Sequence, residues 1–348
     1  MRRTLCAVSL PGPLLLVLDG NSLVHRAYHA GLGEKIFDDR ERPVWALRGL
    51  VGSVARAAAH LRPDAVLVGF DCAESSARRL DWPDYKAHRP AKPADLSEQI
   101  AAAPALLRAA GLCTVVPPSW EADDVLASSA AAARRAGWRS VLMTSDRDAF
   151  ALIDETTSVL RVRNGGFDEA VLIDAGGLPG VCGVAAGQYR DFAALRGDPS
   201  DNLPGVRGFG AATAARLLTV FGSLDAAWAA LDRGEHRAVV EAVGEQPAAR
   251  LAEPGVRERV ERNRRLMRMR ADLPLPALDD ARLPLNYLTM RRALRERGIN
   301  LGPSLWALTG NDVPPPRAAD EPPELRPWVF RRSLSSRRDP TPGQLTLF

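Results

Sequence analysis

The sequence predicts an α/β fold in which a doubly wound parallel sheet is followed by a smaller helical module. From Leu14 to about Val162, apolar runs rich in β-branched residues alternate with longer amphipathic stretches, a pattern typical of a parallel sheet covered by helices. After about Gly187 the pattern changes to short helices separated by glycines. The length of 348 residues fits this division, because it suggests about two domains.

Five apolar runs are the predicted strands, and three amphipathic stretches between them are long enough to be crossover helices. The predicted strands are Leu14–Leu18, Ala65–Phe70, Leu112–Val116, Ser140–Met143 and Ser158–Val162. The predicted helices are Val44–Leu61, Ala94–Ala110 and Ala122–Ala136, with a further helix, Ala211–Phe221, in the helical module.

A polar segment, residues 72–93, interrupts the alternation between a strand and a helix. The segment is long for such a connection, and it contains Trp82, Tyr85 and two of the three lysines in the chain, Lys86 and Lys92. Because long insertions at strand ends commonly carry function, we expect functional residues here.

Composition argues against a membrane protein and against a zinc ribbon. No apolar run reaches the roughly 18 to 20 residues that span a bilayer. The four cysteines form no Cys-x-x-Cys pair and are too few for a disulfide framework in a chain of this length. The apolar stretch after Arg2 and Arg3 lacks a small-residue cleavage site, so we interpret it as leading into a buried strand and expect a cytoplasmic location.

Acidic residues collect where predicted strands end. Asp19, Asp71 and Asp146 each lie within three residues of a strand's carboxyl end, the edge of an open α/β sheet where ligands bind. Taken singly, each acid could instead cap a helix. Carboxylates packed together raise each other's pKa, so a cluster of nine predicts bound cations. The nine are Asp19, Asp71, Glu121, Asp123, Asp124, Asp146, Asp148, Asp198 and Asp201.

The ligand type indicates which cations these would be. Hard oxygen ligands without histidine or cysteine favour Mg²⁺ or Mn²⁺, and the number of acids predicts two or more ions. Once the nine acids are neutralised, the rest of the chain is distinctly basic, which indicates a polyphosphate substrate.

A glycine-rich turn between two helices predicts a helix-hairpin-helix motif. Its glycines would let the backbone approach a phosphate, and the N–H groups that open the second helix would bind it, with K⁺ as a candidate bridging ion. Such a motif binds duplex without reading its sequence, and a purely structural turn is the alternative. The candidate DNA-binding residues are Gly205, Val206, Arg207, Gly208, Gly210 and Thr213.

These motifs resemble the 5′-nuclease family: the N-terminal nuclease domain of bacterial DNA polymerase I, its stand-alone relatives and the flap endonucleases. The pair Glu-Ala-Asp-Asp-Val and Ser-Asp-Asn-Leu-Pro-Gly-Val is highly specific, and the matches run in family order over residues 14 to about 300. The matching stretches are Val17–Ser22, Phe70–Asp71, Tyr85–Arg89, Glu121–Ala127, Thr144–Asp148 and Gly197–Val206.

The resemblance implies a PIN-like nuclease domain over residues 1–186, with an arch at about 72–93, and a helix-hairpin-helix domain over 187–310. It implies that the nine acids hold two or more Mg²⁺ ions, and that Lys86 and Arg89 on the arch lie beside the scissile phosphate. Tyr85 would stack on a base or pack in the core. Ala212 stands where relatives often carry lysine, and Arg147 replaces a usual lysine, but no predicted metal ligand is missing.

Residues 311–348 are rich in proline and arginine and poor in large apolar residues, which is typical of a flexible tail. Their last residues, Gln344, Leu345, Leu347 and Phe348, resemble the peptide by which bacterial DNA enzymes bind the sliding clamp, a chance apolar end being the alternative. The length leaves no room for a polymerase domain after the nuclease, so a free-standing, monomeric enzyme is expected.

The expected activity is structure-specific 5′-3′ exonuclease and flap endonuclease cleavage of DNA near 5′ ends, in Okazaki fragment processing or repair. Two alternatives stay open. A PIN-class ribonuclease would share the acid cluster but lack the glycine-rich module, and a non-catalytic DNA-structure-binding protein would bind flaps without cutting them.

Overall fold

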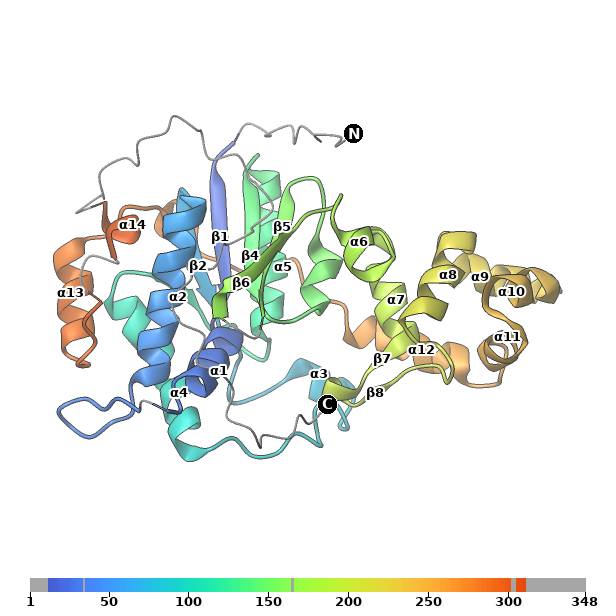
Figure 1. The fold of residues 1–348 in the computed structure, drawn as a ribbon, viewed down its shortest axis with the longest axis horizontal. Coiled ribbons are helices and arrows are strands. Elements are labelled where there is room, and N and C mark those ends of the chain that lie inside the picture. Colours follow the sequence, from blue (N-terminus) through green and yellow to red (C-terminus); the bar gives the residue numbers. More distant parts are fainter. Residues whose placement is uncertain (1–11, 34, 164–165, 302–304, 311–348) are drawn as a thin grey trace, which may run out of the picture.

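The computed structural model describes residues 12–33, 35–163, 166–301 and 305–310. A central sheet with helices on both faces forms one end of the molecule, and a group of short helices extends from it (Figure 1). The predicted tail and clamp-binding peptide, 311–348, lie outside the described residues.

The six strands of the sheet follow the order β3-β2-β1-β4-β5-β6. All neighbours pair in parallel except β5 and β6, which are antiparallel. The chain first builds outward from β1 to β3 and then returns to place β4 on the other side of β1, so the strand order reverses between β1 and β4. Ligands of open α/β sheets bind at such a reversal. The strands are Leu14–Asp19 (β1), Ala65–Gly69 (β2), Cys113–Val115 (β3), Arg139–Thr144 (β4), Thr157–Arg163 (β5) and Gly166–Ile173 (β6).

The two faces of the sheet bury two separate cores, because successive side chains of a strand point to opposite faces. In β1, Leu14, Leu16 and Leu18 pack in one core, and Leu15 and Val17 pack in the other. The first core is closed by four helices and the end of the described chain. These helices are Gly20–Ala30 (α1), Trp45–Leu61 (α2), Ala94–Ala109 (α4) and Tyr287–Arg295 (α13), with the short Trp306–Thr309 (α14) beside them.

The second core continues without a break into the helical group. Val125 and Leu126 of α5 (Ala122–Arg135) belong to it, as do Phe192, Leu217 and Val260 of the helical group. The helices of this group are Leu178–Cys182 (α6), Tyr189–Arg196 (α7), Ala211–Phe221 (α8), Leu224–Asp232 (α9), His236–Val243 (α10), Glu245–Leu251 (α11) and Val256–Leu266 (α12). A small antiparallel pair joins α7 to α8: Gly197–Asp198 (β7) and Leu203–Pro204 (β8).

The last part of the predicted helical domain packs against the sheet and not with the helical group. After α12 the chain returns to the sheet, where Arg282 pairs with Ala65 of β2 and Met290 and Leu308 join the first core. Of the predicted range 187–310, the part from about Leu278 onward therefore packs against the sheet. Its buried side chains, among them Met290, Leu294 and Leu308, complete the first core of the sheet.

The arch segment has little regular structure. It contains one short helix, Ala77–Asp81 (α3), which begins at the N-cap Ser76, and then runs without a regular element to α4. Among the residues that the structure describes there are also four 3₁₀ turns: Asp148–Leu152 (η1), Ala186–Gln188 (η2), Pro199–Asp201 (η3) and Leu278–Ala281 (η4). No single helix of the described chain is long and apolar enough to cross a membrane, although α8 and α9 together, bent by 72°, have the length and composition.

Candidate metal centre

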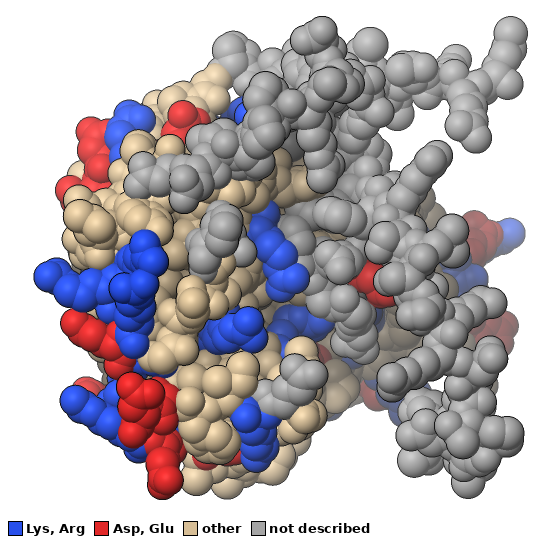
Figure 2. All heavy atoms as spheres, turned by 60° about the vertical axis from the view of Figure 1, so that its left-hand side comes forward, with Lys and Arg blue, Asp and Glu red and all other residues tan. Residues whose placement is uncertain are grey.

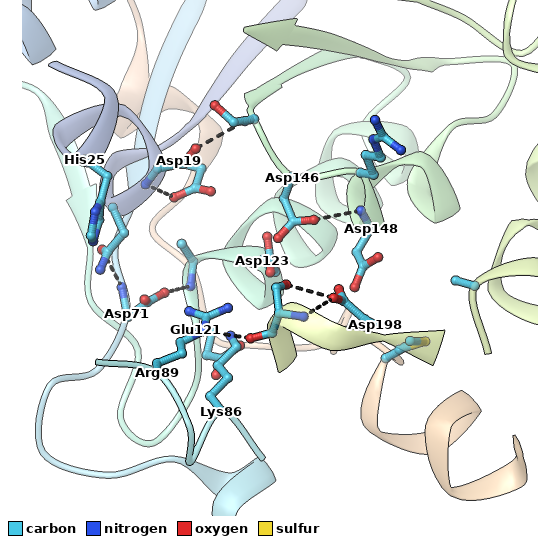
Figure 3. A pocket seen from close by; sticks show the side chains of 18 of the residues that line it. Asp19, His25, Asp71, Lys86, Arg89, Glu121, Asp123, Asp146, Asp148 and Asp198 are labelled. Carbon is cyan, nitrogen blue, oxygen red and sulfur yellow. Dashed lines mark hydrogen bonds and ion pairs between the residues drawn. The ribbon is translucent and has the colours of Figure 1, made fainter. Parts of the chain in front are cut away.

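Seven of the nine predicted acids line one cavity of about 510 Å³. The cavity lies at the carboxyl edge of the sheet, between the ends of β1, β2 and β4 and the β7–β8 turn (Figure 3). The sheet thus brings together residues that are more than 170 positions apart in the sequence. The seven are Asp19, Asp71, Glu121, Asp123, Asp146, Asp148 and Asp198.

Hydrogen bonds fix the acids that follow β1 and β4. Asp19, the last residue of β1, accepts hydrogen bonds from the Ser22 N–H at 2.9 Å and from the Thr144 hydroxyl at 2.9 Å. The Asp146 N–H donates to the same Thr144 hydroxyl at 3.1 Å, and the Asp148 N–H donates to Asp146 at 2.9 Å. Thr144 therefore holds the two strand ends, and their carboxylates, at a set separation.

Asp71 connects the end of β2 to the start of α5. Its N–H donates to the Asn21 side chain at 3.0 Å, and its carboxylate accepts from the Ala122 N–H at 2.8 Å. Close packing supports this arrangement, since a Cβ on Gly20 would lie 2.4 Å from the Phe70 ring. Glycine is therefore required where α1 leaves the sheet edge.

Three acids form a second group at the helical side of the cavity. Asp148, Asp198 and Asp201 can each place one carboxylate oxygen within 4.8 Å of the others. Asp198 is held by the Ser200 N–H at 2.7 Å and the Ser200 hydroxyl at 2.8 Å. The β7–β8 turn that carries these residues is tight, since a Cβ on Gly197 (φ +72°) would lie 2.2 Å from the Gly205 nitrogen.

Without a bound cation, burial and mutual repulsion disfavour the ionised form of these carboxylates. Burial, followed by the charges of Asp71 and Asp146, raises the pKa of Asp19 to about 7. Burial and neighbouring carboxylates also raise the pKa of Asp123 and of Asp148 well above the ordinary value. In addition, the buried Oδ1 of Asp123 accepts no hydrogen bond. An oxygen-only donor set with an unsatisfied buried carboxylate fits a hard divalent cation.

The structure does not bring Asp124 to the cavity. The side chain is fully buried, and its two oxygens accept from the Arg78 guanidinium at 2.7 and 2.8 Å. They also accept from the N–H groups of Glu121 and Arg270. Adjacent residues of a helix point in directions about 100° apart, so Asp123 faces the cavity and Asp124 faces the protein interior.

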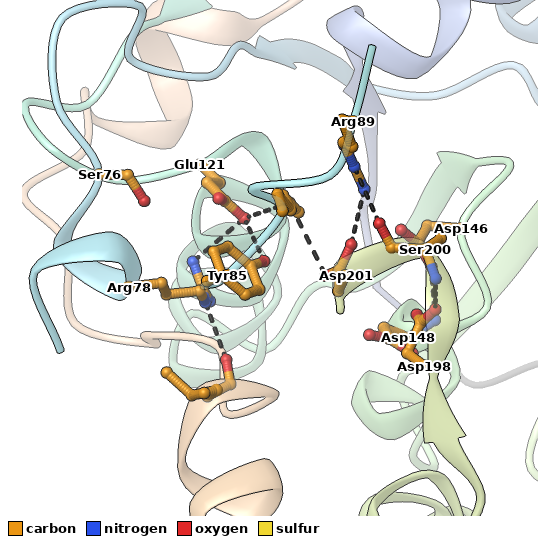
Figure 4. A network of polar contacts seen from close by, with 12 residues as sticks. Ser76, Arg78, Tyr85, Arg89, Glu121, Asp146, Asp148, Asp198, Ser200 and Asp201 are labelled. Atoms are coloured by element: carbon orange, nitrogen blue, oxygen red, sulfur yellow. Dashed lines mark hydrogen bonds and ion pairs between the residues drawn. The ribbon is translucent and has the colours of Figure 1, made fainter. Parts of the chain in front are cut away.

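The arch carries its cations into the acid cluster (Figure 4). The Lys86 ammonium lies 3.0 Å from Glu121 and 3.8 Å from Asp201, and the Arg89 guanidinium lies 2.6 Å from Asp201. Burial alone would lower the pKa of Lys86, but these carboxylates raise it above its ordinary value. Lys86 and Arg89 thus act as counter-ions of the cluster here.

Tyr85 is buried rather than available to a base. Its side chain packs in the second core, and its hydroxyl donates to Glu121 at 3.2 Å. Of the two interpretations of this residue, core packing is the one the structure supports.

The predicted DNA-binding turn divides into buried and exposed positions. Val206 is buried, and its N–H already donates to the Leu195 carbonyl at 2.8 Å, so Val206 is not free to bind phosphate. Arg207, Gly208 and Gly210 are exposed, and Gly210 lies directly before α8, with Thr213 in its first turn. Gly205 is committed to close packing against Gly197.

The cavity also contains basic residues that the sequence analysis did not select. His25 and Arg26 of α1 line it together with Lys92. Burial and the charge of Lys92 lower the pKa of His25 to about 4, so it is neutral near pH 7. The available signal for His25 and Arg26 was their place just after Asp19, in a helix that the sequence does not predict.

Two adjacent regions of the chain match one family. The N-terminal resolvase-like domain of 5′-3′ exonucleases matches residues 14–175, and the C-terminal SAM fold of 5′-3′ exonucleases matches residues 184–287. The chain belongs to the 5′-3′ exonuclease family. This confirms the resemblance seen in the sequence, and the sheet and helical group correspond to the two parts of the family's fold.

Relatives and solved structures agree with this membership. DNA polymerase I of Mycobacterium tuberculosis is 35% identical over 268 residues, which are 77% of this chain and 28% of that protein. The thermostable DNA polymerase I of Thermus aquaticus is 34% identical over 325 residues, which are 89% of this chain and 36% of that protein. The exonuclease-family chain therefore spans about a third of the length of these relatives.

The fold is shared with solved structures of low sequence identity. T5 5′-exonuclease with bound zinc has a TM-score of 0.55 and 21% identity, over 73% of this chain and 89% of that one. Human GEN1 in complex with Holliday junction DNA has a TM-score of 0.52 and 15% identity, over 86% and 72% of the chains. The catalytic core of Rad2 with DNA substrate has a TM-score of 0.51 and 14% identity, over 87% and 93%.

Proposed function

We propose that this exonuclease-family protein is a metal-dependent, structure-specific 5′-3′ exonuclease and flap endonuclease that hydrolyses DNA phosphodiesters near 5′ ends. The observation that carries the proposal is the convergence of seven carboxylates on one cavity, with Lys86 and Arg89 of the arch inside it. Hydrolysis of a phosphodiester needs charge stabilisation and a nucleophile, and this donor set can organise both.

The acids fit two ion sites, with Mg²⁺ or Mn²⁺ as the ions. Asp148, Asp198 and Asp201 would form one, and the acids at the ends of β1, β2 and β4, with Glu121 and Asp123, would form the other. Divalent ions held by these acids would supply a lowered pKa for bound water and charge stabilisation at the phosphodiester. The T5 enzyme with bound zinc supports a cation site in this fold.

Lys86 and Arg89 have a second role in this proposal. While the carboxylates bear uncompensated charge, the two side chains pair with Glu121 and Asp201. When cations neutralise those acids, the two basic groups are free to bind the phosphate that flanks the reacting centre. His25, held neutral by its surroundings, can accept a hydrogen bond at the same rim.

The duplex next to the 5′ end would bind at the turn before α8. The exposed residues Arg207, Gly208 and Gly210, with the opening N–H groups of α8, suit a backbone phosphate, and K⁺ could bridge them to it. The Rad2 and GEN1 complexes with DNA support this use of the fold. The helical group also disfavours the PIN-class ribonuclease, which would lack it.

A cleavage assay tests the proposal. A 5′-flap duplex labelled at its 5′ end is incubated with wild type, with Asp123→Ala and with the exposed control Glu241→Gln, each with Mg²⁺ and with EDTA. We expect a short labelled product only with Mg²⁺, from wild type and the control but not from Asp123→Ala. Flap binding without cleavage by wild type in Mg²⁺ would favour the non-catalytic DNA-binding protein.

The same cleavage assay, with the 5′ end of the flap varied, addresses the cellular role. Okazaki fragment processing predicts that a flap beginning with RNA is cut as well as one of DNA. In this proposal the protein acts as a monomer in the cytoplasm, at the nucleoid. Binding to the sliding clamp through Gln344, Leu345, Leu347 and Phe348 would direct the protein to replication sites. Loss of clamp binding on removal of the last five residues is the expected result, and unchanged binding would contradict it.

A further inference from the structure

A second cavity, of about 670 Å³, lies on the other side of the wall that bounds the metal centre. The wall is thin, because residues adjacent in the sequence line different cavities. Tyr189 and Met267 line the first cavity, and the residues that follow them, Arg190 and Arg268, line the second. The arch borders both cavities, because Lys86 and Arg89 line the first and α3 lines the second.

Most charges in this second cavity are already neutralised. The buried Arg78 is paired with Asp124, and at the rim Arg265 is paired with Asp81 at 2.9 Å. Arg270 is likewise paired with Asp272, at 2.7 Å. These pairs leave little net charge to attract a ligand.

Two guanidinium groups of this cavity form no such ion pair. Within the described part of the chain, no carboxylate lies at ion-pair distance from the side chain of Arg190 or Arg268, and both residues are exposed to the cavity. Burial and the positive charges of Arg268 and Arg264 lower the pKa of Arg190. Arg264 is itself engaged by Asp191, Asp225 and Glu261. Two arginines without an ion-pair partner in one cavity are suited to binding an anion.

The site is held in place by the buried arginine behind it. Arg78 donates to the Leu266 carbonyl at 2.9 Å and to the Arg268 carbonyl at 3.4 Å, which fixes the chain where it leaves α12. Arg190 lies in the first turn of α7 and is fixed by that helix. Both guanidinium groups therefore start from anchored backbones.

The cavity also offers an aromatic surface. The half-buried Trp120 ring lines it, with the Arg270 guanidinium 4.7 Å from the ring centroid. Cations beside an aromatic ring are a combination found where proteins bind single-stranded nucleic acid, through phosphates and, where a face of the ring is open, an unpaired base.

We propose that this second cavity binds the single-stranded 5′ segment of the substrate beyond the metal centre, with Arg190 and Arg268 contacting its phosphates. The proposal rests on the proposed function. Since Lys86 and Arg89 serve the metal centre, a strand that continues past the arch needs other cations. Arg190 and Arg268 lie nearby, on the other side of the wall.

Binding of flaps of different length tests this inference without catalysis. In EDTA, the affinity for one duplex carrying a one-nucleotide or a fifteen-nucleotide 5′ flap is measured by fluorescence anisotropy. The proteins are wild type and Arg190→Gln/Arg268→Gln. The matched control is Arg292→Gln/Arg295→Gln, two exposed arginines of α13. That end of the molecule carries acidic and basic side chains interspersed (Figure 2).

We expect the double variant to bind the long flap about tenfold more weakly and with a salt slope reduced by about one to two, and to bind the short flap as wild type does. An equal loss for both flaps would assign the arginines to the duplex, and no loss, or a loss matched by the control, would remove the site. Because the measurement needs no cleavage, it stands even if wild type does not cut in Mg²⁺, which would be a failure of the proposed function alone.

Discussion

Arg78 holds both carboxylate oxygens of Asp124, at 2.7 and 2.8 Å, and the Asp124 side chain is completely shielded from solvent. The same guanidinium lies 3.3 Å from Glu121, which lines the metal centre. One arginine thus connects the arch, the start of α5 and the end of α12. The ion pair with Arg78 explains why Asp124 has a structural role although its neighbour in the sequence, Asp123, lines the metal centre.

Breaking this pair should destabilise the protein. Arg78→Met leaves the buried Asp124 carboxylate without its ion-pair partner, so we expect the free energy of unfolding to fall by about 3 to 5 kcal/mol. Urea unfolding measures the change. The exposed pair Arg270 and Asp272 is the control, and Asp272→Asn should change stability by less than about 1 kcal/mol. Equal effects of the two substitutions would contradict the structural role.

Removing a carboxylate from the metal centre should have the opposite effect on the metal-free protein. Asp123→Asn eliminates a buried charge whose pKa is raised by burial and by Asp146 and Asp19. We expect the free energy of unfolding in EDTA to rise by on the order of 1 kcal/mol at pH 8. A decrease, measured by the same urea unfolding, would show that Asp123 makes stabilising contacts instead.

The raised pKa of Asp19 predicts how stability depends on pH. Its pKa is about 7 in the folded protein against 3.8 as the ordinary value, so between these the folded state binds more protons than the unfolded state. The stabilisation of the folded state by protonated Asp19 is therefore complete below about pH 4, and it is lost as the pH rises through about 7. In EDTA, the free energy of unfolding should fall more for wild type than for Asp19→Asn between about pH 5 and about pH 8. Parallel pH profiles would contradict this.

The dual role of Lys86 predicts two separable losses. Lys86→Met should slow flap cleavage by about 100-fold in saturating Mg²⁺, because the phosphate loses a nearby charge. In EDTA the same variant should also be less stable, because Glu121 loses one of its two counter-ions. With saturating Mg²⁺ the stability difference should shrink. A stability loss that is the same with and without Mg²⁺ would indicate a purely structural lysine.

Much of the sheet could be predicted from the sequence because its strands are short, continuous apolar runs. All five predicted strands are observed within one residue of their predicted ends, and α8 has the predicted bounds. The first helix, α1, was not predicted, because Gly20-Asn21-Ser22 has the composition of a turn. Here Asp19 caps a helix that begins at that turn. The antiparallel strand β6 was also missed.

The site was predictable in its members but not in their orientation. Acids at three strand ends must meet at one edge, and seven of the nine do line one cavity. The different roles of Asp123 and Asp124 depend on which side of α5 each faces, and the burial of Tyr85 depends on how the arch folds back. Arg78 gave no signal at all, because arginine is common throughout this chain.

Divalent-ion binding by two neighbouring variants tests the central claim most directly. Mn²⁺ binding to wild type, Asp123→Asn and Asp124→Asn is measured by isothermal titration calorimetry at one pH, with folding verified by circular dichroism. We predict that wild type binds at least two ions, that Asp123→Asn loses or weakens one of them, and that Asp124→Asn binds as wild type does wherever it is folded. Retained binding by Asp123→Asn, together with loss of binding by folded Asp124→Asn, would contradict the account.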